Sequence, residues 1–321
     1  MKALCICTLL IWLFGAPARA ADAYPSKAIT IIVPVPPGSA NDLAARLASE
    51  VITAQSGQPV VISNRGGAGG LIGMSAAAKA APDGYTLIAA SSGQITGTRL
   101  MFADAPVDPL KDLEPIAPVI NVQIIAAIHK DVPARTLTEF AALSRARPGE
   151  FNYTSGGAGS GTHLAGDQLL RQMGLNMTHI AYKGASPAVT DVVAGRVQMI
   201  ILSPGSLIAH LRSGSLRPLV VASHKRISFA PEIPTSIDAG VPDWNVSVWF
   251  GIFGPRGLPK EIIERVNGFI QRLGNDTSVT KRVNDGFMDL MPMTSDQFGR
   301  FVRDDAAKWE RIIKDAGIKP Q

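Results

Sequence analysis

Short apolar runs alternate along the chain with longer segments of helical periodicity. The run Ile29–Val33 is continuous and β-branched, which predicts a buried strand. Apolar residues then recur at helical spacing from Leu43 to Ala54, and charged residues occupy the opposite face. Two more strands are predicted at 58–63 and 85–90, with an alanine-rich helix between them. Strands that alternate with helices predict a parallel sheet covered on both faces.

The same alternation returns in the second half of the chain. Further strands are predicted at 124–128, 151–154, 179–182, 197–202, 216–222 and 246–253, and only helices are predicted after the last of these, at 260–275 and 294–314. We expect two α/β lobes, because the chain starts a second unit near Gln123 and returns through a proline-rich segment after Phe229. The predicted lobes are 24–123 with 228–321, and 124–227.

The start of the chain has the features of a secretory signal peptide. A short basic region, Met1-Lys2, precedes the apolar segment LCICTLLIWLFG, which is too short to span a bilayer. Small residues at Ala18 and Ala20 predict cleavage after Ala20. The alternative is a membrane anchor, but no other apolar run follows. We therefore expect residues 1–20 to be removed and the protein to be exported to the periplasm.

Composition excludes several kinds of chemistry. Both cysteines, Cys5 and Cys7, lie in the predicted signal peptide, so the mature chain would have no thiol for a disulfide, a nucleophile or a metal site. The formal net charge of +5 falls to +3 when Lys2 and Arg19 are removed. The remaining basic residues are scattered, and we therefore expect no binding to nucleic acid.

A glycine-rich loop, TSGGAGSGTH at 154–163, connects a predicted strand to a predicted helix. A helix N-terminus has unpaired N–H groups and about half a positive charge, so it favours an anion. Glycines allow the backbone to approach a ligand closely, while Ser155, Ser160 and Thr162 could donate hydroxyl hydrogen bonds. The alternative is a flexible connection in which Thr162 caps the helix.

Two other loops have the same placement between a strand and a helix. In PVPPGSAND at 34–42, Gly38 permits a tight turn, and Ser39 with Asp42 resembles a helix cap. For Asp42 a structural role is favoured, because its carboxylate can satisfy N–H groups of its own helix. The third predicted strand ends in Ser91-Ser92. Three such helix N-termini around one cleft would make a pocket that attracts anions.

Motifs of enzymes are absent from the sequence. The chain contains no G-x-S-x-G, no G-x-x-x-x-G-K-[ST] and no complete G-x-G-x-x-G. Its five histidines form no H-x-x-x-H or H-x-H pair, which argues against a metal site. His163 lies beside the candidate pocket, where we expect a structural hydrogen bond. A serine hydrolase with Ser160 or Ser92 as nucleophile would need His163 as its base.

Several segments together resemble a known family. The segments are IVPVPPGSANDLAARLAS, SNRGGAGGLIGMSAAAKAAPDGYTL, FNYTSGGAGSGTHLAG, YKGASPAVTDVVAGRVQM and PEIPTSIDAGVPDWNVSVWFGIFGPRGLP. In this order they resemble the signatures of the Bug-type substrate-binding proteins, which are the periplasmic receptors of tripartite tricarboxylate transporters. The resemblance covers nearly all of the mature chain. It implies a two-lobed, type II periplasmic-binding-protein fold, with a ligand cleft between two doubly wound α/β lobes that close on a small carboxylate.

The resemblance also implies which segments hold the ligand. In the family, the first strand–helix loop and an S-x-G-x-G-S-x-x-H loop grip one carboxylate, largely through backbone amides, hydroxyls and ordered water. One departure is Ser39, which stands where the family usually has glycine and so bears on the volume and polarity of the pocket. The candidate ligand-binding residues are Val35, Pro36, Pro37, Gly38, Ser39, Asn41, Asp42, Ser91, Ser92, Ser155, Gly156, Gly157, Ala158, Gly159, Ser160, Thr162, His163, Tyr182 and Ser203.

The sequence as a whole predicts a monomeric, extracytoplasmic solute-binding protein. It would capture a small organic acid, a mono- or dicarboxylate, and deliver it to the membrane subunits of a tripartite tricarboxylate-type transporter. We expect no catalytic residue, metal or cofactor. The alternatives are a secreted serine hydrolase on the same fold, and a ligand sensor for a membrane receptor.

Overall fold

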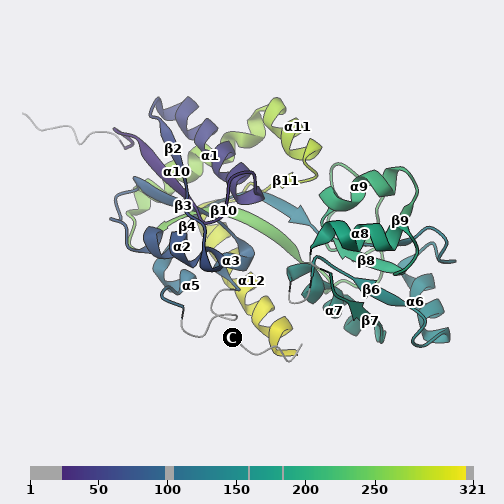
Figure 1. The fold of residues 1–321 in the computed structure, drawn as a ribbon. Coiled ribbons are helices and arrows are strands. Elements are labelled where there is room, and N and C mark those ends of the chain that lie inside the picture. Colours follow the sequence, from purple (N-terminus) through teal and green to yellow (C-terminus); the bar gives the residue numbers. More distant parts are fainter. Residues whose placement is uncertain (1–23, 98–104, 158–159, 183, 316–321) are drawn as a thin grey trace, which may run out of the picture.

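The computed structural model describes residues 24–97, 105–157, 160–182 and 184–315. Two sheets, each covered by helices, form two lobes that lie side by side (Figure 1). This arrangement confirms the predicted two-lobed α/β fold. The predicted signal peptide lies outside the described residues.

The first sheet has six strands in the order β11-β4-β10-β3-β1-β2. One face is covered by helices α1, α10 and α11, and the other by α2, α3, α5 and α12. The strands are β1 (Ile29–Val33), β2 (Val60–Asn64), β3 (Thr86–Ser91), β4 (Leu113–Gln123), β10 (Ser247–Pro255) and β11 (Asp289–Leu290). The helices are α1 (Ala40–Ser56), α2 (Leu71–Ala78), α3 (Ser92–Ile95), α5 (Pro109–Asp112), α10 (Lys260–Gln271), α11 (Thr277–Asp285) and α12 (Ser295–Asp315), with short 3₁₀ turns at Ala68–Gly70 and Arg272–Asn275.

The second sheet has five strands in the order β7-β6-β8-β5-β9. Helices α6 and α7 cover one face, and α8 and α9 cover the other. The strands are β5 (Ile125–His129), β6 (Asn152–Thr154), β7 (Thr178–Ile180), β8 (Met199–Leu202) and β9 (Leu216–Val221). The helices are α6 (Leu137–Ala146), α7 (Gly161–Met173), α8 (Ala185–Val193) and α9 (Pro204–Arg212).

Both sheets are mixed, whereas the sequence pattern predicted parallel strands. In the first sheet β10 runs antiparallel to both β3 and β4, so that β3 and β4 end at the same edge. Only Ile124 separates β4 from β5, and β5 begins opposite Leu202, where β8 ends. The carboxyl edge of each sheet, where its parallel strands end, therefore faces that of the other sheet across the connection from β4 to β5. A strand that enters a sheet from that edge has to run against the parallel strands, which explains β5 and β10.

Two further features correct the sequence-based expectation. The strand β4 was not predicted, although it lies inside the first sheet between β11 and β10. The two-residue strand β11 follows β10, where only helices were expected. Such a short strand has too few residues to show an alternating pattern.

The segment between β9 and β10 packs with the second sheet. Ile233, Val241 and Trp244 are buried in the hydrophobic cores on its two faces. The predicted lobes placed the return of the chain at residue 228. From this packing we propose instead that the second lobe extends to residue 246 and that the chain returns at Ser247, where β10 begins.

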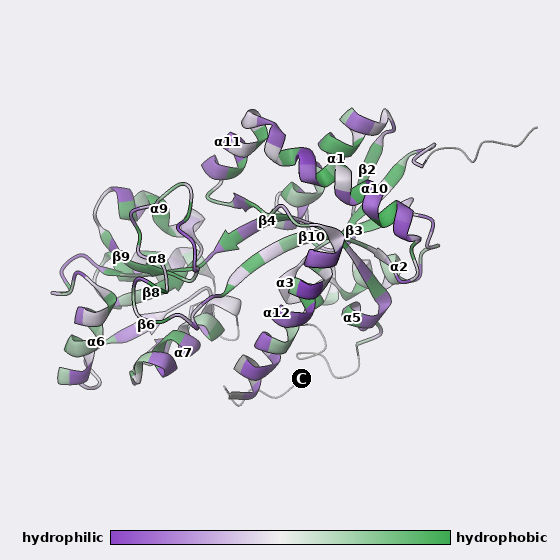
Figure 2. Cartoon of the chain, turned by 180° about the vertical axis from the view of Figure 1, so that it is seen from behind, coloured by the Kyte–Doolittle hydropathy of each residue, from purple (hydrophilic) through white to green (hydrophobic). Residues whose placement is uncertain are grey.

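Helix α12 contributes to both lobes. Phe298 packs in the core of the first sheet, whereas Trp309, three turns later, packs in the same core of the second sheet as Trp244. Figure 2 shows hydrophobic residues along the strands and an alternation of hydrophobic and hydrophilic residues along α12. No helix within the described ranges is long and apolar enough to cross a membrane.

Candidate functional site

The first candidate loop connects β1 to α1 and is organised by the cap of that helix. Ser39 is the N-cap residue, and its hydroxyl oxygen accepts a hydrogen bond from the Asp42 amide at 3.2 Å. The cap that the sequence predicted at Ser39 and Asp42 is therefore present. The Ser39 side chain is used by its own helix, which is how the loop accommodates a side chain at this position.

Asp42 and Asn64 hold the first loop in place. The Asp42 carboxylate is almost fully buried and accepts hydrogen bonds from the Gly38 amide (3.1 Å) and from Arg46 Nε (2.9 Å). Asn64, at the end of β2, donates from Nδ2 to the Asp42 carboxylate at 3.3 Å and to the Val35 carbonyl at 3.1 Å. Burial opposes ionisation of Asp42, but these hydrogen bonds and the Arg46 charge hold its pKa below the ordinary value. Asp42 thus has the structural role that its position favoured.

A buried amide pair connects the first loop to the loop after β3. Asn41 Nδ2 donates to Gln94 Oε1 at 2.7 Å, and the same oxygen accepts from the Ser91 amide at 3.0 Å. Space around Gln94 is tight, because a Cβ at Gly70 would lie 2.7 Å from Gln94 Nε2. Asn41 and Gln94 therefore fix two of the candidate loops relative to each other. Sequence reasoning missed Gln94, although Ser91 and Gln94 have the spacing of a capping box; its distant partner, Asn41, has no local signal.

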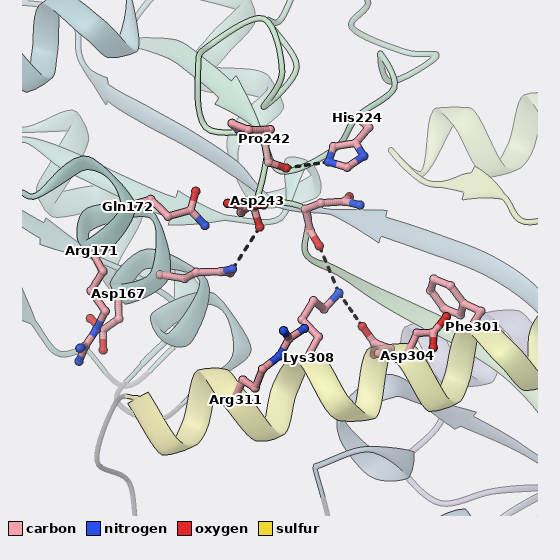
Figure 3. Close-up of a pocket in the computed structure, with 13 residues that line it drawn as sticks. Asp167, Arg171, Gln172, His224, Pro242, Asp243, Phe301, Asp304, Lys308 and Arg311 are labelled. Atoms are coloured by element: carbon pink, nitrogen blue, oxygen red, sulfur yellow. Dashed lines mark hydrogen bonds and ion pairs between the residues drawn. The ribbon is translucent and has the colours of Figure 1, made fainter.

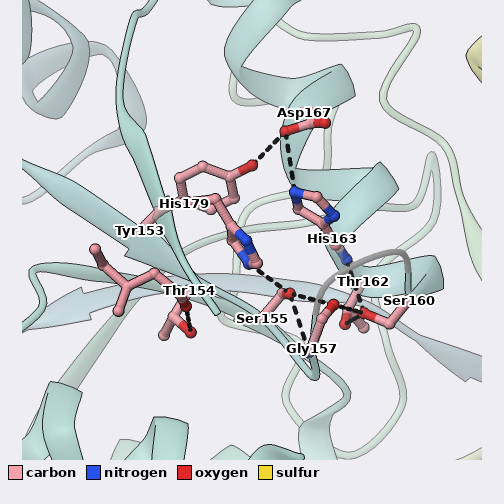
Figure 4. Close-up of polar contacts among 10 residues, drawn as sticks. Tyr153, Thr154, Ser155, Gly157, Ser160, Thr162, His163, Asp167 and His179 are labelled. Atoms are coloured by element: carbon pink, nitrogen blue, oxygen red, sulfur yellow. Dashed lines mark hydrogen bonds and ion pairs between the residues drawn. The ribbon is translucent and has the colours of Figure 1, made fainter. Parts of the chain in front are cut away.

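The glycine-rich loop is held by hydrogen bonds among its own residues (Figure 4). Ser160 Oγ donates to the Gly157 carbonyl at 2.8 Å and accepts from the His163 amide at 3.2 Å, so Ser160 is the N-cap of α7. Thr162, which would cap the helix if the loop were only a flexible connection, instead accepts a hydrogen bond from the Gly156 amide at 2.9 Å. The cap at Thr162 belonged to the alternative interpretation of the loop, and it is not observed because the helix begins at Gly161.

These bonds leave main-chain groups, not hydroxyls, for a ligand. The hydroxyls of Ser155, Ser160 and Thr162 all have partners inside the lobe. Among the described residues, the amides of Gly161 and Thr162 have no hydrogen-bond acceptor, as expected for the first turn of a helix. Ala158 and Gly159, also predicted to contact ligand, lie outside the described residues.

Two histidines stack beside this loop. The rings of His163 and His179 are 3.8 Å apart and nearly parallel, and His179 Nε2 lies 2.9 Å from Ser155 Oγ. Asp167 receives a hydrogen bond from the Tyr153 hydroxyl, and its carboxylate lies 3.7 Å from His163 Nε2. Burial, and then the neighbouring His163, lower the pKa of His179 to about 4, so its ring is neutral at pH 7. His179 was not among the predicted site residues.

Tyr182 and Ser203 follow β7 and β8 at the same edge of the second sheet. The Tyr182 hydroxyl donates to Asp191 at 2.5 Å, and Asp191 also pairs with Arg196 at 2.6 Å. This hydrogen bond raises the pKa of Tyr182. Ser203 is the N-cap residue of α9 but makes no side-chain cap hydrogen bond. The Tyr182 phenol is therefore engaged within its lobe, whereas the Ser203 hydroxyl caps no amide of α9.

The topology brings the predicted residues into two groups. The loops after β1 and β3 form one group on the first sheet, joined by the contact of Asn41 with Gln94. The loops after β6, β7 and β8 form the other, because these strands are parallel neighbours. Both groups lie on the carboxyl edges that face each other at Ile124, which is where open α/β sheets bind ligands.

A separate hollow of about 620 Å³ lies between α7 and α12 (Figure 3). Basic residues such as Arg171 and Arg311 line it together with acidic residues such as Asp243 and Asp304. Lys308 donates across it to the Asn245 carbonyl at 3.1 Å. None of the predicted ligand-binding residues lines this hollow, and its balanced charges give it no preference for an anion.

Comparison with known proteins shows what the chain is similar to. The family model described as tripartite tricarboxylate transporter family receptor matches residues 44–318. Protein BugT of Bordetella pertussis is 34% identical over 304 residues, which cover 93% of this chain and 92% of that protein.

Two solved structures share the fold. A TctC solute binding protein from Polaromonas superposes with a TM-score of 0.82 at 26% identity, over 91% of this chain and 99% of that one. The R. palustris protein Rpa4515 with adipate superposes with a TM-score of 0.74 at 30% identity, over 93% of this chain and 100% of that one. The family and these neighbours are substrate-binding proteins.

Proposed function

The chain belongs to the tripartite tricarboxylate transporter receptor family, and we propose that it is an extracytoplasmic solute-binding protein that captures a small organic carboxylate. The two lobes close on the ligand, and the closed protein delivers it to the membrane subunits of a tripartite tricarboxylate-type transporter. The adipate bound to Rpa4515 supports a carboxylate as the ligand.

One observation carries the proposal: the N-termini of two long helices open on the facing edges of the sheets. Helices α1 and α7 have 17 and 13 residues, and each is capped by a serine, Ser39 or Ser160. Each serine satisfies the amide at the third helical position and leaves the first two, which in α7 belong to Gly161 and Thr162. Such amides, together with the partial positive charge of the helix end, bind a carboxylate without a basic side chain.

Neither candidate nucleophile supports hydrolysis, since Ser92 is buried and Ser160 makes other contacts. Among the described residues, the Ser160 hydroxyl contacts the Gly157 carbonyl, the Thr162 hydroxyl and the His163 amide, but no imidazole. Ser155 does contact an imidazole, that of His179, but it is fully buried. A nucleophile has to reach its substrate, so we propose that the protein is not an enzyme. A role as ligand sensor would use the same cleft and differs only in the membrane partner.

We further propose that residues 1–20 are a signal peptide and that the mature protein works in the periplasm as a monomer, without a nucleic-acid partner. The family and its periplasmic relatives support this location.

Thermal shift of the mature chain, residues 21–321, tests the ligand class. The panel contains adipate, shorter and longer dicarboxylates, monocarboxylates and aromatic acids, and adipamide serves as an uncharged control of matched length. A ligand at 100 times its Kd should stabilise the protein by about 2.7 kcal/mol, and calorimetry then gives the affinity. Equal shifts with adipate and adipamide, or no shift with any acid, would reject the proposal.

A further inference from the structure

The edge strand β7 contacts the start of the glycine-rich loop at two residues, and the chain just after β7 lies close to the turn of the loop. Thr154 Oγ1 donates to the Ile180 carbonyl at 2.7 Å, and Ser155 Oγ lies 2.9 Å from His179 Nε2. Two residues beyond the end of β7, the Tyr182 carbonyl lies 3.1 Å from where a Cβ at Gly157 would be. The position of the loop is therefore set from the side by this strand and the residues after it.

Ser155 links the imidazole of His179 to the turn at Gly157. Its hydroxyl oxygen accepts from the Gly157 amide and can donate to the Gly157 carbonyl, both at 3.3 Å. The φ of Gly157 is +133°, a conformation that glycine adopts readily and that residues with a Cβ rarely adopt. The Gly157 carbonyl in turn accepts from both the amide and the hydroxyl of Ser160, the cap of α7. Contacts therefore run without a gap from His179 to the N-terminus of α7 (Figure 4).

The ring of His179 is itself held on both sides. His163 stacks on it with an interplanar angle of 25°, and the Tyr153 ring centroid is 4.9 Å away. Ser155 is fully buried, so water does not compete for its hydroxyl. The 2.9 Å hydrogen bond joins a ring held by its neighbours to a hydroxyl shielded from solvent, and it therefore fixes the direction of the hydroxyl.

We propose that His179 is a positioning residue for ligand capture, which acts through the Ser155 hydroxyl to hold the Gly157 turn and the first amides of α7 in their binding geometry. The effect of His179 on ligand binding rests on the proposed function, whereas its effect on the loop does not. The competing explanation is that His179 only fills space under the loop, as any ring or chain of similar size would.

Amide hydrogen exchange of the ligand-free protein, read by mass spectrometry on peptides that span 154–164, separates the two explanations. H179L removes the polar atom, whereas H179Q places a side-chain amide at a comparable reach. Exchange in this segment should accelerate by about tenfold in H179L and in S155A, remain near the wild-type rate in H179Q, and accelerate no further when H179L is added to S155A. H210L and H210Q, on α9, control for loss of a histidine elsewhere in the lobe.

Three results would show that His179 does not act through Ser155: unchanged amide exchange in H179L, equal exchange rates in H179L and H179Q, or additive effects of H179L and S155A on exchange. Calorimetry with adipate then tests the consequence for binding, with an affinity loss of about tenfold expected in H179L and recovery in H179Q. If the exchange result holds but adipate affinity is unchanged in H179L, the role in capture is wrong while the proposed function stands. If the wild type binds no acid, the proposed function fails. The exchange rates of the single and double variants still decide whether His179 acts through Ser155 on the loop.

Discussion

Replacing Gly157 with alanine should disable the carboxylate site without unfolding the lobe. The φ of +133° at this position is one that residues with a Cβ rarely adopt, and holding such a residue there costs about 1–3 kcal/mol. The added Cβ would also lie 3.1 Å from the Tyr182 carbonyl, tighter than an ordinary contact. The turn will relax to relieve the backbone strain and the close contact, and the carbonyl of residue 157 will then lose its hydrogen bond from the Ser160 hydroxyl. We expect a loss of about 1.4–2.7 kcal/mol in binding, or about 10- to 100-fold in Kd.

Gly214→Ala is the matched control for this change. Gly214 lies in the same lobe between α9 and β9, has a φ of +72°, and has no atom within 4 Å of its added Cβ. Both variants should therefore lose some thermal stability from backbone strain, whereas only Gly157→Ala should lose affinity in calorimetry with the identified acid. Wild-type affinity in Gly157→Ala would refute the assignment of this loop to the ligand. Gly159, the other predicted ligand-binding glycine of this loop, lies outside the described residues.

Four further predictions follow from single features. Ser160→Ala should lower stability by about 1 kcal/mol through loss of the α7 cap, and should weaken binding less than Gly157→Ala does, as melting and calorimetry can check. Because the pKa of His179 falls from 6.5 to about 4 on folding, the unfolded chain takes up this proton first. The contribution of neutral His179 to stability is complete above about pH 6.5 and is lost as the pH falls toward 4. Between these pH values the melting temperature of His179→Gln should therefore fall less than that of the wild type. Identical profiles of melting temperature against pH would contradict the lowered pKa of His179. Trp309→Ala should cost on the order of 3 kcal/mol in denaturant melts, because the ring is buried in the second core; a surface-like effect would contradict its bridging position. Intact mass of periplasmic material should show a chain that starts at Ala21, and retention of residues 1–20 would refute the signal peptide.

Strong local patterns predicted the elements that carry the site. The strand at Ile29–Val33 was predicted with its observed bounds, since a β-branched run bounded by proline has few other solutions. The cap at Ser39 was also predicted, because its signal is local. The strand β4 was not predicted, because Pro115 and Pro118 interrupt it and proline normally argues against an inner strand. In the structure the register against β10 shifts next to each proline, so each one sits at an irregularity of the ladder.

The supporting side chains could not be predicted, because each of them meets its partner only through sheet pairing. His179 is 24 positions from Ser155, and only the parallel register that pairs Tyr153 with His179 brings its ring to the loop. Asn64 likewise reaches the first loop because it pairs with Val33 at the end of β1. A single sequence contains no spacing rule for such contacts. Strand order and register have to be known first.

Under the proposed function, side chains and main chain have different roles in the loops at 34–42 and 154–163, and this difference affects selectivity. In both, polar side chains such as Asp42 and Ser155 bind the loop's own backbone, which leaves main-chain amides for the ligand. Amides at a helix end recognise the charge and plane of a carboxylate, but they carry no information about the rest of the acid. Loop variants such as Gly157→Ala should therefore weaken all bound acids by a similar factor. Preference among acids therefore has to come from the remaining surfaces of the cleft. A loop variant that reversed the order of affinity for two acids would show that the loop contacts more of the ligand than its carboxylate.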